Sequence, residues 1–348
     1  MTRRRPLLAL AASAAAAALL LTGCAAGEGS AIADNEPTAA PDEEQRWSDD
    51  TLTLDFATYN PLSLVVKDQG WLEDATSGDV TVTWVQSAGS NKANEALRAG
   101  AVDVGSTAGS AALLARSNGS PIKTIDIYSQ PEWSAIVVGA NSPLTSVSEL
   151  AGKKVAATKG TDPYFFLLQA LEEAGVPLES VDVQNLQHAD GKTALENGSV
   201  DAWAGLDPLM ATSEATAGSR LLYRNVDFNT YGFLNATEDF LEESPDLAQL
   251  VVNAYEKARE WAQENPEETA GILAEAAGID PAIATATLER TTLDIDPAPG
   301  KTQRDVLEIV GPIFVESGDV PNQEQVDDAL DSLFDDSYAS RANPDALN

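Results

Sequence analysis

The sequence predicts an α/β fold built as two lobes. Short runs of small and branched apolar residues alternate with helix patterns, which is typical of parallel sheets covered by helices on both faces. About 300 residues follow the N-terminal segments, more than one hydrophobic core usually serves. A pattern also repeats, since Leu97-x-x-Gly100-x-Val102-Asp103 returns as Leu195-x-x-Gly198-x-Val200-Asp201. The same order of helix end, glycine and strand in both copies indicates two lobes of related architecture.

The first 23 residues are predicted to be a signal peptide. Three arginines precede an apolar run from Leu7 to Leu21 that is too short and too alanine-rich for a membrane span. Leu21-Thr-Gly-Cys24 resembles the bacterial lipobox, so Cys24 is the expected lipidation site; a plain secretory signal with a chance cysteine is the alternative. Because Cys24 is the only cysteine, an internal disulfide and a thiolate metal cluster are excluded.

Residues 24–46 are small, polar and acidic, which predicts a lipidated flexible tether before a fold that begins near Trp47. Acidic residues outnumber basic ones by 55 to 21, and loss of Arg3, Arg4 and Arg5 leaves a balance of 18 − 55 = −37. This charge excludes a nucleic-acid partner and indicates a solvated surface.

Residues 47–133 are expected to form the first part of lobe 1. Three predicted strands each end in a polar loop that leads into a helix, and a fourth strand follows. The strands are expected at 51–57, 80–85, 102–104 and 122–128, and the helices at 61–70, 92–98 and 108–117.

Residues 134–228 are expected to form lobe 2, which begins with a strand at 134–138. Its central stretch reads as a strand at 154–157, a turn, and a helix from Pro163 that ends at Gly175. The start of such a helix attracts anions, and ligands of open α/β sheets lie past the carboxyl ends of strands. This stretch is therefore either an ordinary strand-helix unit or one wall of a ligand site.

Residues 229–348 are expected to return to lobe 1, with hinge segments near 130–134 and 226–231. A strand is predicted at 231–235, followed only by helices and by a frayed tail after Ser337. The later helices are expected to begin near Pro245, Pro266, Pro281, Thr302 and Asn322.

Three phrases carry a resemblance to a known family: 150–155 (LAGKKV), Gly160-Thr161, and 200–208 (VDAWAGLDP). They resemble the solute-binding proteins of ABC importers, and most closely the nitrate, taurine and aliphatic-sulfonate class. The resemblance covers about Leu52 to Tyr223. It implies a type II periplasmic-binding-protein-like fold, in which a hinge joins two lobes and a ligand is held in the interlobe cleft. It also implies delivery to a membrane permease driven by an ATPase, by a monomer anchored outside the cytoplasm through Cys24.

The resemblance implies a set of cleft residues at the ends of strands. They are Thr58, Tyr59, Asn60, Ser87, Gly89, Ser90, Ser106, Thr107, Gln130, Gly160, Thr161, Asp162, Trp203 and Asp207. Small polar residues at such positions also serve as turn and cap residues, and Trp203 also fits a core position. Asp162 and Asp207 are either helix caps or counter-ions for a ligand. A carboxylate at Asp162 departs from the family pattern and argues against nitrate or a plain sulfonate.

Two classes of binding function therefore remain open. The first is a receptor for a small organic anion or zwitterion, such as an aliphatic sulfonate or taurine. The second is a receptor for a cationic or neutral heterocycle, with the aspartates as counter-ions and Tyr59 or Trp203 as stacking faces. Catalysis is not expected, because His188 is the only histidine and no nucleophile elbow, P-loop or dinucleotide fingerprint is present. The single histidine also disfavours a metal site, and no cofactor is expected.

Overall fold

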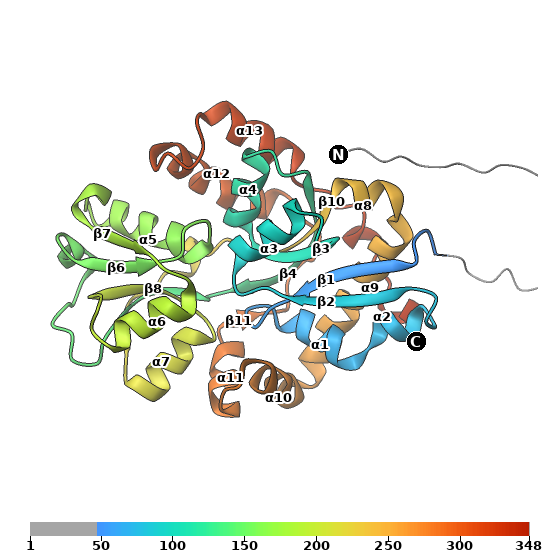
Figure 1. Ribbon diagram of the computed structural model, residues 1–348, viewed down its shortest axis with the longest axis horizontal. Helices are drawn as coiled ribbons and strands as arrows, with labels where there is room; N and C mark the ends of the chain where they lie inside the picture. The colour runs from blue at the N-terminus through green and yellow to red at the C-terminus, as the bar shows by residue number, and fades with distance from the viewer. Residues whose placement is uncertain (1–46, 348) are drawn as a thin grey trace, which may run out of the picture. The chain divides into compact units, whose positions relative to one another are not determined.

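The structure, a computed structural model, describes residues 47–347. The predicted signal peptide and tether, including Cys24, lie outside the described residues. The remainder forms two sheets with helices on both faces of each, which confirms the predicted α/β class (Figure 1).

The six-stranded sheet is built from strands that lie far apart in the sequence. In order across the sheet they are β11 (Thr291–Thr292), β4 (Ile122–Pro131), β10 (Gly232–Thr237), β3 (Val104–Ala108), β1 (Thr51–Phe56) and β2 (Thr81–Gln86). The five-stranded sheet has the order β7 (Asp182–Asn185), β6 (Lys154–Ala157), β8 (Ala202–Leu206), β5 (Ser134–Val138) and β9 (Arg220–Tyr223).

Helices occupy both faces of each sheet (Figure 1). Beside the six-stranded sheet lie α1 (Pro61–Gln69), α2 (Trp71–Ala75), α3 (Ser90–Arg98), α4 (Gly109–Ser117), α8 (Glu238–Glu243) and α9 (Pro245–Glu264). Beside the five-stranded sheet lie α5 (Asp162–Glu173), α6 (His188–Glu196) and α7 (Leu209–Ala217). The C-terminal helices are α10 (Pro266–Ala277), α11 (Pro281–Leu288), α12 (Lys301–Glu316) and α13 (Gln323–Ser332).

The chain passes between the sheets twice. It leaves the six-stranded sheet after Pro131 and enters the five-stranded sheet at Ser134; it returns after Tyr223 and re-enters at Gly232. Asn229 joins the two crossing segments, because its Oδ1 accepts a hydrogen bond from the backbone N–H of Ser134 at 3.0 Å. The segments therefore lie side by side.

The sheets are mixed, whereas the alternation of strands and helices in the sequence indicated parallel ones. β10 runs antiparallel to β3 and β4, and β5 runs antiparallel to β8. Both are the strands that follow a crossing. The carboxyl ends of the strands beside them point toward the region where the two sheets meet. A strand that follows a crossing starts in that region and runs away from it, so it is antiparallel to its neighbours.

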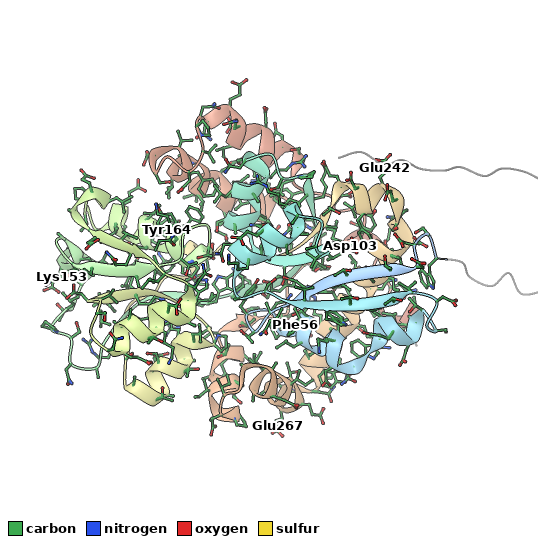
Figure 2. All side chains as sticks on the ribbon, in the orientation of Figure 1. Phe56, Asp103, Lys153, Tyr164, Glu242 and Glu267 are labelled. Atoms are coloured by element: carbon green, nitrogen blue, oxygen red, sulfur yellow. The ribbon has the colours of Figure 1, made fainter. Side chains whose placement is uncertain are left out.

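The repeated sequence pattern makes the same contact in both sheets. Asp103, labelled in Figure 2, precedes β3 and accepts a hydrogen bond from the N–H of Thr53 at 2.8 Å, while its own N–H donates to the Thr53 carbonyl. Asp201 precedes β8 and exchanges the same two bonds with Lys154, at 2.9 and 2.8 Å. This equivalence supports two related halves.

One apolar cluster extends over both sheets. It includes Phe165 of α5 and Phe314 of α12, whose ring centroids are 4.6 Å apart, and it continues to α4 and α13. The cluster packs the start of the five-stranded half against the C-terminal helices. A second cluster lies under α1 and α9, and a third under α6 and α7.

Two predictions for the C-terminal third are wrong. A two-residue strand, β11, follows β10 and pairs with β4; it is too short to give a periodic signal. The tail is not frayed, because Tyr338 and Ala339 are buried against α9 and the N–H of Asn343 donates to Asn253 at 2.9 Å. The tail sequence is polar, but its few apolar side chains fill a groove that only the folded chain forms.

Candidate ligand-binding site

Asp162, at the start of α5, lies at the centre of the region where the two sheets meet. Its side chain is 1% exposed and accepts four hydrogen bonds. The hydroxyls of Ser110 and Thr230 donate to Oδ1, each at 2.6 Å; Trp133 Nε1 and the N–H of Thr230 donate to Oδ2 at 2.8 and 3.0 Å. Burial raises the pKa of Asp162, and these four bonds oppose that rise.

The partners of Asp162 come from separate parts of the fold. Ser110 belongs to the first turn of α4, whereas Trp133 and Thr230 lie in the two crossing segments. Asp162 does not cap its own helix: the N-cap residue of α5 is Thr161, and the carboxylate bonds only outside the helix. Asp162 therefore fastens α5 to both crossings and to the six-stranded half.

Asp207, after β8, already has a cationic partner in the chain. Its Oδ2 lies 3.4 Å from Arg290 Nη1, and its Oδ1 accepts the N–H of Ala211 in α7 at 2.8 Å. Arg290 also pairs with Glu214 at 2.6 Å. Burial raises the pKa of Asp207 to about 7, although the charge of Arg290 opposes the rise. This ion pair links the segment after α11 to the five-stranded half.

Five of the expected cleft residues gather at the carboxyl ends of β1, β2 and β3. They are Tyr59, Ser87, Gly89, Ser90 and Ser106, all buried. The Tyr59 hydroxyl donates to the Ser106 carbonyl at 2.9 Å, and the Ser90 hydroxyl accepts the N–H of Ala108 at 3.0 Å. The Tyr59 ring meets Trp133 edge to face at 5.9 Å between centroids.

Asp55, at the end of β1, binds one member of this group, Ser106. Its Oδ1 accepts bonds from the N–H and hydroxyl of Ser106 at 2.8 and 2.9 Å. The side chain is fully buried, and burial raises its pKa to about 7. At neutral pH this carboxyl is therefore partly protonated.

Gly89 and His188 bring the two halves into contact. A Cβ built on Gly89 would lie 3.0 Å from His188 Cδ2 and Nε2, and 3.0 Å from Asn91 Oδ1. Gly160 and Thr161 lie nearby: Gly160 adopts a left-handed conformation (φ 75°), and the Thr161 hydroxyl donates to the Thr158 carbonyl at 2.6 Å. Loops after β2 and β6 and the start of α6 thus meet.

A cavity of about 360 Å³ opens beside this contact. Its walls are α3, α4 and the loop before α5, and its lining includes Asn91, Asn94, Arg98 and Gly160. The volume falls within the range of small-molecule sites, roughly 300–1,000 Å³.

The other expected site residues lie elsewhere. Asn60 caps α1 and donates to the Tyr255 hydroxyl, and Thr58 lies half-buried in the turn before it. Thr107 accepts a bond from Asn235 at 2.9 Å, inside the six-stranded sheet. Gln130 lines a separate cavity of about 310 Å³ near the start of α12. Trp203 is fully buried in the cluster under α6 and α7.

Several residues of this region were not expected from the sequence. Asp55, Trp133, Thr230, Arg290 and Asn91 carry no local motif, and their roles depend on partners distant in the chain. His188 enters the sequence analysis only as the single histidine, and the structure places it at the start of α6. An aspartate inside an otherwise apolar strand was the one available signal for Asp55.

Two absences hold for residues 47–347. No group of three or more His, Cys, Asp or Glu side chains is arranged to hold a metal ion. No helix there combines the length and apolar character that a membrane crossing requires.

Two sheets linked by two crossings, with polar loops meeting between them, define a periplasmic-binding-protein fold. Among solved structures, the alkanesulfonate-binding protein SsuA of Xanthomonas axonopodis pv. citri, bound to MOPS, superposes with a TM-score of 0.73 at 23% identity, covering 81% of this chain and 98% of that one. The chain belongs to the NMT1/THI5-like family, whose model matches residues 61–269.

Two relatives carry provisional names as aliphatic sulfonates-binding proteins. The one from Escherichia coli (strain K12) is 30% identical over 219 residues, 62% of this chain and 69% of the relative. The one from Bacillus subtilis (strain 168) is 30% identical over 238 residues, 67% of this chain and 71% of the relative. The named relatives are binding proteins, which agrees with the absence of catalytic motifs in this sequence.

Proposed function

We propose that this protein captures a small organosulfonate between its two halves and delivers it to the permease of an ABC importer. The observation that carries the proposal is the meeting of α3 and α6. Neither helix has a side-chain cap on its N-terminus among the described residues, and the starts of the two helices lie together where Gly89 meets His188. First-turn N–H groups without a side-chain cap and the helix dipoles favour an anion at this position.

The adjacent cavity supports the same ligand class. Arg98 lines it, and its guanidinium is held by the Asn118 carbonyl at 2.7 Å, an uncharged partner. Glu95 lines it too, but pairs with Lys92 at 2.7 Å. The two sulfonate-binding relatives point in the same direction.

The alternative, a cationic or neutral heterocycle held by Asp162 and Asp207, receives less support. Asp162 already accepts four bonds, and Asp207 is paired with Arg290. Both carboxylates therefore already have partners within the chain, and neither needs a ligand cation.

Calorimetry on the purified full chain tests the proposal. We expect ethanesulfonate or taurine to bind, and an alkylammonium ion without a sulfonate not to bind. Binding of the ammonium ion alone would reject the sulfonate assignment in favour of the alternative. Native mass spectrometry of protein from its own host would identify the retained ligand directly.

The proposal extends to location and motion. We infer that Cys24 carries a lipid that anchors a monomer outside the cytoplasm, and that residues 134–228 rotate as lobe 2 against residues 47–133 and 229–348. Cys24→Ala should move the protein from the membrane fraction to the soluble extracellular fraction without unfolding it. Wild-type protein found wholly in the soluble fraction would contradict the lipid anchor.

A further inference from the structure

His188, the only histidine of the chain, is held in one tautomer by its surroundings. It is 1% exposed, and its Nδ1 lies 3.2 Å from the hydroxyl of Thr158. That hydroxyl donates its proton to the Leu186 carbonyl at 2.7 Å, so it can only accept from His188. Nδ1 must therefore carry the imidazole proton, which leaves Nε2 as a bare acceptor. Burial also lowers the pKa of His188 to about 4, so the ring is neutral at pH 7.

Asn91 presents a second acceptor to the same point. Its Nδ2 is directed to Gln187 Oε1 at 3.5 Å, and its Oδ1 faces the Cα of Gly89. Asn91 Oδ1 and His188 Nε2 are each 3.0 Å from the position of a Cβ on Gly89, so they are separated by at most twice that distance.

Both acceptors are buried without a hydrogen-bond partner in the part of the chain that the structure describes. Buried acceptors are almost always satisfied in folded proteins, so two in one place indicate that something outside the chain supplies the donor. Asn91 also lines the 360 Å³ cavity, so one of the two acceptor side chains borders a space that a small molecule can occupy. The N-terminus of α3, which has no side-chain cap, lies beside it.

We propose that His188 Nε2 and Asn91 Oδ1 accept hydrogen bonds from a donor group of the bound sulfonate: an ammonium group donates to both acceptors, and a hydroxyl donates to one of them. The protein then selects aminoalkanesulfonates and hydroxyalkanesulfonates over unsubstituted alkanesulfonates. This specificity rests on the proposed sulfonate-binding function. Unlike the earlier expectation for Asp162 and Asp207, it assigns recognition of the donor to uncharged acceptors.

Calorimetry with three ligands of similar size tests the selectivity on the full chain. We expect taurine and 2-hydroxyethanesulfonate to bind about tenfold more tightly than ethanesulfonate, as for one buried hydrogen bond. His188→Leu removes one of the two acceptors and should reduce this preference, whereas His188→Gln retains an acceptor amide and should keep more of it. Asn91→Asp should favour taurine over 2-hydroxyethanesulfonate, because a carboxylate prefers an ammonium group.

Nitrogen NMR of wild-type protein tests the same proposal without a variant that could misfold. Since His188 is the sole histidine, ¹⁵N-histidine labelling of untagged protein gives one pair of ring resonances. We expect Nε2 to be unprotonated, and its resonance to shift with taurine and 2-hydroxyethanesulfonate but not with ethanesulfonate.

The outcomes separate the two proposals. Equal affinity for all three ligands, or an Nε2 that carries the proton, would overturn the donor-selective site and leave sulfonate binding intact. Binding of none of the three would overturn both.

Discussion

At the scale of single residues, Gly89 determines how closely the two halves approach. Its backbone is extended (φ 161°), which any residue adopts, so alanine brings no backbone strain at this position. The added methyl group would lie 3.0 Å from His188 and Asn91, closer than ordinary contact. We expect Gly89→Ala to hold the halves apart and weaken sulfonate binding by roughly 1–3 kcal/mol, about fivefold to a hundredfold.

Gly139→Ala is the matched control, because a Cβ at Gly139 meets no atom within 4 Å and the backbone there is not left-handed. Calorimetry of both variants checks the expectation. Affinity lost equally in both, or in neither, would contradict a steric role for Gly89 in closure.

Asp55 makes stability depend on pH. Its pKa in the folded protein, about 7, is raised above the ordinary 3.8, so the folded state holds a proton that the unfolded state releases. The contribution is complete below about pH 4 and is lost as the pH rises through 7, by up to about 1.4 kcal/mol per pH unit. Urea denaturation from pH 4 to 8 should show the free energy of unfolding falling in this range.

Asp55→Asn should reduce that slope without removing it, since the pKa of Asp207 is also raised to about 7. The amide oxygen can still accept both bonds from Ser106. A slope unchanged by the substitution would show that Asp55 ionises normally in the folded protein.

At the scale of secondary-structure elements, α5 depends on Asp162 for its position. Asparagine has one acceptor oxygen, which can replace Oδ2; its NH₂ group would then face the hydroxyls of Ser110 and Thr230, which must turn to accept from it and lose the acceptor for their own protons. Leaving two buried donors without acceptors should lower the free energy of unfolding by roughly 2–6 kcal/mol. Chemical denaturation measures the loss, and Asp190→Asn, at an exposed position in the first turn of α6, is the control. Equal stability of the two variants would contradict the role of Asp162.

Most elements could be predicted from the sequence because their signals are local. Pro245 and Pro266 begin helices where expected, and the strand at 134–138 has the expected bounds. The partners of Asp162 could not be predicted, since Trp133, Ser110 and Thr230 lie 29, 52 and 68 positions away. Any Asp before a proline looks like a helix cap until its distant neighbours are known.

The same limit applies to the candidate site. Its loops at strand ends could be located from the sequence, because strand, turn and helix follow one another. Which loops touch depends on the packing of two sheets, and no periodicity encodes the contact of Gly89 with His188. Trp203 illustrates the difficulty. It lies on a strand, β8, but the pairing of that strand and the face on which the side chain lies place Trp203 in the core under α6 and α7.

At the scale of the whole molecule, ligand binding should couple closure to stability. A ligand that binds only the folded state at a hundred times its Kd adds about 2.7 kcal/mol to the free energy of unfolding, so the melting temperature should rise by several degrees. If the halves rotate about the two crossings, small-angle scattering should show a smaller radius of gyration with taurine. An unchanged radius together with a raised melting temperature would indicate binding without closure.

Asp103 and Asp201 each fasten neighbouring strands within one half of the protein. Each aspartate binds backbone of its own sheet, and neither bond involves the loops between the sheets. We therefore expect substitutions in the loops of one half to leave the aspartate–backbone bonds of the other half in place. Ligand preference can then change through evolution on one side at a time. We expect a chimera that takes residues 134–228 from a relative with an aspartate at the position of Asp201 to keep both sets of bonds and to change the ligand contacts on one side of the site.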